Sequence, residues 1–157
     1  MILSLHAAAG AVLASSSGSI GQAIVLGIVS HYFLDSLPHI EYSIENVGKG
    51  NFKMAGKEFA GIAIDLLASI MIALYMVQGQ SYGRSAIILI GAFFALIPDG
   101  LGFLDFCVKN KERNIFTKFL KMHSNFHKKI HSTVLNKIIA MPSQIIIVLI
   151  LAYAVLK

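Results

Sequence analysis

The nine residues from His31 to His39, "HYFLDSLPH", place two imidazoles and a carboxylate close together in the chain. His31 and Asp35 are four residues apart, so on a helix they share one face about 6 Å from each other. Pro38 ends such a helix and turns His39 back toward the same end. Imidazole nitrogens and carboxylate oxygens are ligands for zinc and similar divalent cations, and an open coordination position holds an activated water. The stretch therefore indicates one wall of a metal site.

Three further histidines have helical spacing near the other end of the chain. His123, His127 and His131 follow one another at i, i+4 and i+8. Each step rotates the side-chain direction by only about 40° on a helix of 3.6 residues per turn. Lys128 and Lys129 point away from the face that the three imidazoles share. This pattern predicts a second wall of the same kind of site.

Three more polar residues lie within or at the end of apolar stretches: His6, Asp65 and Asp99. An ionised side chain at bilayer depth costs at least about 2.5–3.5 kcal/mol, which makes it a functional candidate by default. Simpler interpretations remain open for each. His6 fits a packed or capping residue, Asp65 fits a hydrogen bond between packed helices, and Pro98-Asp99-Gly100 fits a helix-ending turn.

The composition points to a membrane. Of the 157 residues, 56% are hydrophobic and 13% charged, with a mean hydropathy of +0.73, which is too apolar for an ordinary soluble domain. The length predicts one domain over 1–157. The single cysteine excludes an internal disulfide and a cysteine zinc cluster. The apolar start has no basic region before it and no clean cleavage site, so we expect no removable signal peptide.

We expect an all-α fold, a polytopic membrane helix bundle. A helix needs about 20 apolar residues to cross a bilayer, and several stretches approach that length. The first of them is short and suits a shallow or tilted helix. The predicted membrane segments cover roughly 2–16, 18–38, 58–79, 84–104 and 139–156.

Basic residues are distributed unevenly between the two sides of this bundle. Of the 13 lysines and arginines, only Arg84 and Lys157 fall outside loops 39–57 and 105–138. The positive-inside rule therefore places both loops in the cytoplasm and the C-terminus outside, in a cell (inner or plasma) membrane. Under this topology all six histidines, Asp65 and Asp99 come to the cytoplasmic side, which is improbable for residues placed independently.

The second basic loop interleaves lysines with apolar side chains over about 112–136. That pattern predicts an amphipathic helix in the membrane interface, in contact with anionic lipid head groups. A solvated basic loop is the alternative. We expect membrane lipids as partners and no nucleic acid.

Several of these motifs resemble a known family. "HYFLDSLPH" is similar to the His-Tyr-x-x-Asp…Pro-x-His signature of bacterial zinc-dependent phospholipases C, with a shorter spacing to the second histidine. More of the chain resembles the small membrane-bound, metal-dependent hydrolases thought to be related to them. Matching motifs are His6, "SHYFLD" at 30–35, "LIPDG" at 96–100 and "HKKIHS" at 127–132. The order of motifs differs, the paired histidines are one residue closer, and the proline-aspartate turn lacks a following Asp-x-His.

The resemblance implies a hydrolase that uses metal-activated water against a phosphoester or another ester of a lipid-like substrate. Zinc, as one or two ions, suits this chemistry because it lowers the pKa of a bound water to about 7. Asp65 and Asp99 are the candidates for a general base or an orienting carboxylate. The implied metal ligands are His31, Asp35, His127 and His131, with His6, His39, His123 and Asp99 as further candidates.

Three other functions use similar residues. A divalent-metal binding or transport protein should place its polar residues near the midplane, often within internal repeats, whereas here they gather at one face and no repeat is found. A bis-histidine haem protein would leave Asp35, Asp65 and Asp99 unexplained. A structural membrane protein with a degenerate site is the fourth interpretation. The one-sided clustering favours the hydrolase.

Overall fold

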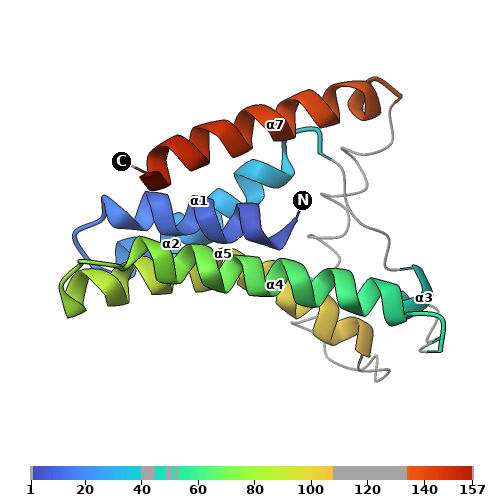
Figure 1. Ribbon diagram of the computed structural model, residues 1–157, viewed down its shortest axis with the longest axis horizontal. Coiled ribbons are helices and arrows are strands. Elements are labelled where there is room, and N and C mark those ends of the chain that lie inside the picture. The colour runs from blue at the N-terminus through green and yellow to red at the C-terminus, as the bar shows by residue number, and fades with distance from the viewer. Residues whose placement is uncertain (1, 40–44, 49–50, 52, 108–133, 157) are drawn as a thin grey trace.

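The computed structural model describes residues 2–39, 45–48, 51, 53–107 and 134–156, and its described residues are helical with no strand (Figure 1). The all-α prediction is therefore confirmed at the level of class. A single helical turn, α3 (Glu45–Gly48), accompanies the longer elements. The long helices are α1 (Leu3–Ser15), α2 (Ile20–Asp35), α4 (Gly56–Met76), α5 (Tyr82–Cys107) and α7 (Val134–Leu156).

Each of the five predicted apolar segments forms one of these long helices, and three of them are long and apolar enough to cross a membrane. These are α4, α5 over Tyr82–Phe103, and α7 over Ile138–Val155. The other two, α1 and α2, have 13 and 16 residues, which at 1.5 Å per residue is roughly 20 and 24 Å. A bilayer core is about 30 Å thick, so length and composition support three spans.

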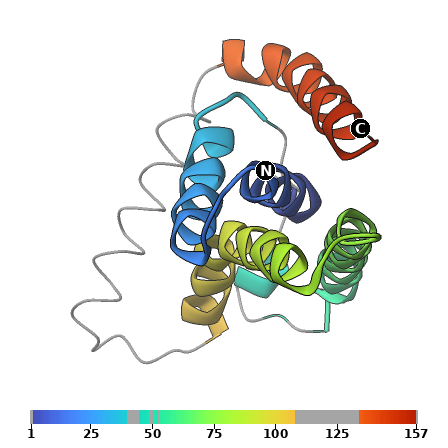
Figure 2. The same ribbon diagram turned by 90° about the vertical axis from the view of Figure 1, so that its left-hand side faces the viewer.

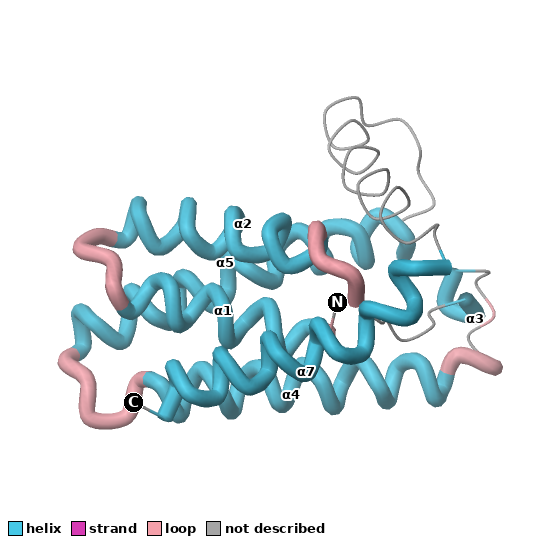
Figure 3. Tube along the Cα trace, turned by 90° about the horizontal axis from the view of Figure 1, so that it is seen from above, coloured by secondary structure: helices cyan, strands magenta, loops and turns pink. Residues whose placement is uncertain are grey.

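Helix α1 lies in the middle of the bundle (Figure 2). It contacts α2, α4, α5 and α7, and its side chains from Leu5 to Ala11 are buried around most of its circumference. Most of these residues are alanine or glycine, which allow the neighbouring helices to approach closely. Seen from above, the five long helices run along a common direction (Figure 3).

Three glycines set the closest approach between α1, α2 and α5. Gly10 and Gly27 both face the backbone of Gly91, so a Cβ added to Gly27 would lie 2.5 Å from the Gly91 carbonyl oxygen. A Cβ added to Gly91 would lie 2.6 Å from the Gly10 carbonyl oxygen and would overlap Ala14. The three helices therefore meet backbone to backbone, as small residues permit inside membranes.

Hydrogen bonds from neighbouring helices anchor both ends of α2. Ser19 accepts a hydrogen bond from the Gln22 amide as the N-cap of α2. Arg84, near the start of α5, donates from Nη1 to the Ser17 carbonyl oxygen at 2.8 Å. At the other end of α2, Ser143 of α7 donates to the Pro38 carbonyl oxygen. Both ends of α2 are thus held by neighbouring helices.

Helix α5 does not end at Pro98-Asp99-Gly100, although that sequence also fits a helix-ending turn. It continues through Pro98 to Cys107. A proline removes one backbone donor and displaces one carbonyl, and a helix packed on its neighbours can absorb this as a local distortion. Asp99 is therefore a side chain on a continuous helix. The amphipathic helix expected over about 112–136 falls mainly on residues outside the described ranges.

Replacing Gly91 by alanine should destabilise the bundle by about 1–3 kcal/mol, because the added methyl group would overlap Ala14 and the Gly10 carbonyl. Thermal unfolding in detergent measures this effect. Gly83→Ala on the same helix is the matched control, since no atom lies within 4 Å of its added Cβ. Equal melting temperatures for the two variants would contradict the close approach.

Candidate metal centre

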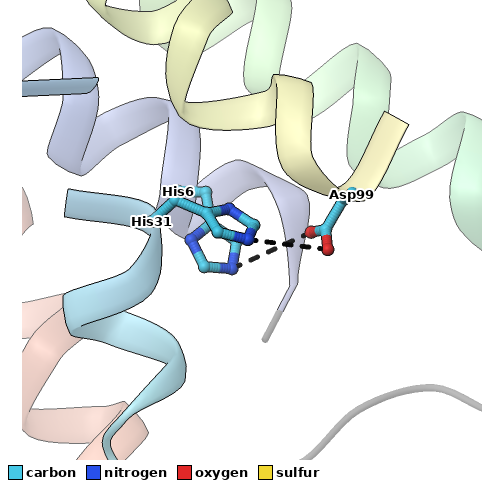
Figure 4. Close-up of side chains that lie close together, drawn as sticks. All are labelled: His6, His31 and Asp99. Carbon is cyan, nitrogen blue, oxygen red and sulfur yellow. Dashed lines mark ion pairs between the residues drawn. The ribbon is translucent and has the colours of Figure 1, made fainter. Parts of the chain in front are cut away.

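Five of the residues predicted for the site come together where α1 begins and α2 ends. His6 lies near the start of α1, His31 and Asp35 on the last turns of α2, and His39 just after that helix. Asp99 reaches the same place from α5. In Figure 4 both imidazoles turn a nitrogen toward the Asp99 carboxylate. Residues far apart in the sequence thus form one cluster.

The two carboxylates face the same pair of imidazole nitrogens. Asp35 Oδ2 is 3.0 Å from His31 Nε2, and Asp35 Oδ1 is 3.3 Å from His6 Nε2. Asp99 lies slightly farther away, with Oδ1 3.8 Å from His31 Nε2 and Oδ2 3.9 Å from His6 Nε2. His39 Nε2 is 3.9 Å from Asp35 Oδ1. Three imidazoles therefore direct Nε2 toward carboxylate oxygens.

The cluster is buried except at Asp99. The side chains of His6, His31 and Asp35 are 0% exposed, whereas that of Asp99 is 23% exposed. A buried charge is costly unless it is paired or coordinates a metal. Water or another small molecule can therefore reach these groups at Asp99.

Backbone carbonyls determine which ring nitrogen of two histidines carries a proton. His31 Nδ1 is 2.9 Å from the Ala95 carbonyl oxygen, and His39 Nδ1 is 2.7 Å from the Leu37 carbonyl oxygen. A carbonyl only accepts, so each Nδ1 must donate. The Nε2 of a neutral imidazole then carries a lone pair. Histidines that ligate metals are commonly held in this tautomer by such second hydrogen bonds.

Helix α5 contributes two groups to the cluster, one on each side of Pro98. The Ala95 carbonyl oxygen accepts from His31 Nδ1, and the Asp99 side chain faces the imidazoles. Pro98 has no N–H, so the Phe94 carbonyl lacks its usual helical donor.

A cation between these groups would resolve an electrostatic conflict. A neutral His31 with its proton on Nδ1 turns a lone pair toward carboxylate oxygens, which is repulsive unless a proton or metal ion lies between them. His6 stacks on His31 with ring centroids 4.2 Å apart, so protonating both rings would bring two positive charges together. Neither ring nitrogen of His6 makes a hydrogen bond within the described part of the chain.

The spacing of these atoms fits a divalent metal. Ligands about 2.1 Å from a tetrahedral zinc lie roughly 3.4 Å from one another. The imidazole-to-carboxylate distances of 3.0–3.9 Å bracket that value. His6, His31 and Asp99 each offer a ligand atom within 4.8 Å of the other two. The donor set, imidazole and carboxylate, is the one that zinc and similar ions accept.

Asp65 binds backbone amides of α1 and not the side chains of this cluster. Its Oδ2 accepts a hydrogen bond from the Leu3 amide at 2.6 Å, and its Oδ1 accepts one from the Ser4 amide at 3.0 Å. Ile2, the N-cap residue of α1, provides no side-chain cap of its own. A carboxylate from α4 therefore caps α1, satisfying amides that lack helical partners and complementing the helix dipole.

The structure leaves part of the predicted ligand set untested. His123, His127 and His131 lie outside the described residues. Two backbone groups, the Ala95 and Leu37 carbonyls, were not foreseen from the sequence. Their signals were present, since each lies close before a proline, Pro98 or Pro38.

Replacing Asp65 by alanine should lower the stability of the protein by about 0.5–2 kcal/mol, because the first amides of α1 lose their acceptors. It should also weaken divalent-metal binding, since His6 follows two residues after the capped segment. Asp65→Asn keeps an acceptor oxygen and should lose less stability. Thermal unfolding and metal titration in detergent measure both effects. Unchanged stability with lost activity would instead indicate the general-base role expected from the sequence.

Comparison with known proteins gave no match to this chain among family models, curated proteins or solved structures, so the geometry of the site carries the functional interpretation.

Proposed function

We propose that this protein is a membrane-embedded metal-dependent hydrolase that cleaves a phosphoester or another ester of a lipid-like substrate. The observation that supports it is the convergence of His6 Nε2 and His31 Nε2 on two carboxylates at 3.0–3.9 Å. Two carboxylates carry two negative charges, which a divalent ion balances while the imidazoles stay neutral. The proposal extends the resemblance described from the sequence motifs.

His6, His31 and Asp99 are the proposed ligands, which leaves a coordination position open, as in catalytic zinc sites. A zinc ion bound there would act as a Lewis acid and lower the pKa of a water in the open position to about 7. Asp35 lies 3.0 and 3.3 Å from the same two Nε2 atoms and is fully buried. It would balance charge at the ion and is a further candidate ligand, as expected from the sequence.

Asp99 has a second role because it is the accessible carboxylate of the centre. One of its oxygens can bind the ion while the other accepts a proton from the attacking water, since a carboxylate has several lone pairs. A general base must lie within hydrogen-bond reach of the proton that it removes. Asp99 meets that requirement better than Asp65, whose two oxygens are occupied by the α1 amides.

The geometry of the two imidazoles argues against the haem interpretation. In a bis-histidine haem the two imidazoles bind opposite faces of the porphyrin, whereas His6 and His31 stack at 4.2 Å with 28° between their planes. Divalent-metal binding without catalysis is the second candidate, because the same ligands support it.

Metal content tests the first part of the proposal. The protein purified in detergent should contain about one divalent ion per chain, measured by elemental mass spectrometry, with no Soret band. His6→Ala and His31→Ala should each lose the ion because each removes one of three proposed ligands. Glu58→Gln is the control: this acid bonds Asn46, away from the cluster. Retention of metal by both histidine variants would refute the ligand assignment.

Hydrolysis tests the second part. Metal-loaded protein should release product from fluorogenic phospholipid or ester substrates in mixed micelles, and a chelator should abolish the activity. Asp99→Asn at saturating metal should slow the reaction by about 10²–10⁴-fold because it removes the proposed proton acceptor. Metal binding without hydrolysis of any substrate would favour the metal-binding alternative.

We also propose that α1 and α2 lie within the membrane alongside the three long helices, with the metal centre at the cytoplasmic face. Short helices can remain at bilayer depth when neighbouring helices surround them, and α1 has α2, α4, α5 and α7 around it. The orientation rests on the basic loops of the sequence.

Cysteine accessibility tests this orientation in a Cys107→Ser background. Gln80→Cys lies in the exposed turn between α4 and α5 and should react with an impermeant thiol reagent on intact cells. Lys53→Cys, before α4, should react only after the membrane is opened. The opposite pattern would reverse the proposed topology.

A further inference from the structure

An apolar groove lies between α1, α4 and α7. Its volume is about 420 Å³, within the range of about 300–1,000 Å³ that is typical of small-molecule sites. Tyr75 is the one lining residue with a polar group. The groove is lined by Leu5, Ala8, Met71, Ile72, Tyr75, Val148, Leu151, Ala152 and Val155.

The groove faces the surroundings of the protein. Two of its walls are helices that are long and apolar enough to cross a membrane, α4 and α7. Met71 on α4 is 71% exposed, and Tyr75 and Val148 are also exposed. In a bilayer these residues contact lipid, so lipid chains can enter the groove laterally without crossing water.

The groove begins beside the metal centre. Leu5 lines it and directly precedes His6 on α1. Leu5 also belongs to a buried apolar cluster with Leu34, the residue before Asp35, and this cluster packs against Leu151 of α7. A continuous apolar surface therefore joins the groove to the helix turns that carry His6 and Asp35.

The dimensions of the groove select its occupant. Val148 and Val155 are seven residues apart, which is about 10 Å along a helix. A volume of about 420 Å³ over that length corresponds to a cross-section of roughly 40 Å², about half that of a helix 10 Å across. A flexible hydrocarbon chain therefore fits inside the groove, whereas a transmembrane helix of a second copy could only cover it from outside.

We propose that this groove binds a segment of an acyl chain and that the lipid so held is the substrate of the metal centre. The chain would lie against Met71, Tyr75 and Ala152 while its ester or phosphoester reaches the centre past Leu5. The identification of this lipid as substrate rests on the proposed hydrolase function, whereas the binding of the chain does not. The substrate class is then a membrane lipid with at least one long hydrocarbon chain.

A photoreactive lipid tests the groove. The full-length protein is reconstituted in phosphatidylcholine vesicles with a small fraction of phosphatidylglycerol that carries a mid-chain diazirine, and cross-linked peptides are mapped by mass spectrometry. We expect labels within 71–75 and 148–155. Ala152→Phe should reduce labelling by roughly tenfold, since excluding about two methylene groups weakens binding by that factor.

Ala154→Phe is the matched control, because Ala154 is exposed on the same helix and does not line the groove. It should leave the labelling unchanged, and both variants should keep the metal content of the unmodified protein. Equal labelling of the two variants, with metal retained, would overturn the proposal that the groove binds an acyl chain. If neither the parent nor the variants bind metal but only Ala152→Phe loses labelling, the hydrolase proposal fails and the acyl-chain site stands.

Discussion

The burial of the Asp35 carboxylate beside two stacked imidazoles is the constraint on which the candidate site depends. A carboxylate with no exposed surface must be paired, and its oxygens lie 3.0 and 3.3 Å from His31 and His6. Because the Ala95 carbonyl holds the proton of His31 on Nδ1, the nitrogen that faces Asp35 carries a lone pair when the ring is neutral. The proposed divalent ion would relieve that repulsion, and the second carboxylate, Asp99, would balance the rest of its charge.

The packing of the bundle brings the helices that carry these residues close together. Backbone contact at Gly10, Gly27 and Gly91 brings α1, α2 and α5 close enough for short side chains to meet. An aspartate reaches only a few ångströms from its backbone, so larger residues at these glycines would separate the groups. Asp65 then sets the start of α1 by capping its first amides. The residue that looked like a catalytic carboxylate in the sequence thus positions the helix that carries His6.

The exterior of the molecule is consistent with a bilayer rather than water. The described parts of α4 and α7 expose most of their apolar side chains, and only 11% and 12% of their candidate spans are buried. In a membrane such surfaces need no protein partner, because lipid tails are as apolar as leucine. The groove between α1, α4 and α7 extends this lipid-facing surface to Leu5, beside the centre. An enzyme built this way would receive its substrate from the membrane plane.

Much of this architecture is readable from the sequence because hydrophobic runs and helical spacing are local properties. The runs located the five long helices, and the i, i+4 spacing of His31 and Asp35 predicted their shared face. Apolar runs interrupted by His6 and Asp99 marked these two as candidates, since polar groups are costly in such segments. The runs marked the first segment as short, but they did not reveal that α2 is also shorter than a bilayer core.

Tertiary structure decided which polar residues meet. Asp65 and Asp99 are both acids in apolar helices, yet one caps α1 and the other faces the two imidazoles. That difference follows from how α4 and α5 are rotated against α1, which depends on contacts made by residues far apart in the chain. The sequence by itself determined the helices and the kinds of ligand available. Only the tertiary packing, with its close backbone contacts at Gly91, determined which of those candidate ligands lie close together.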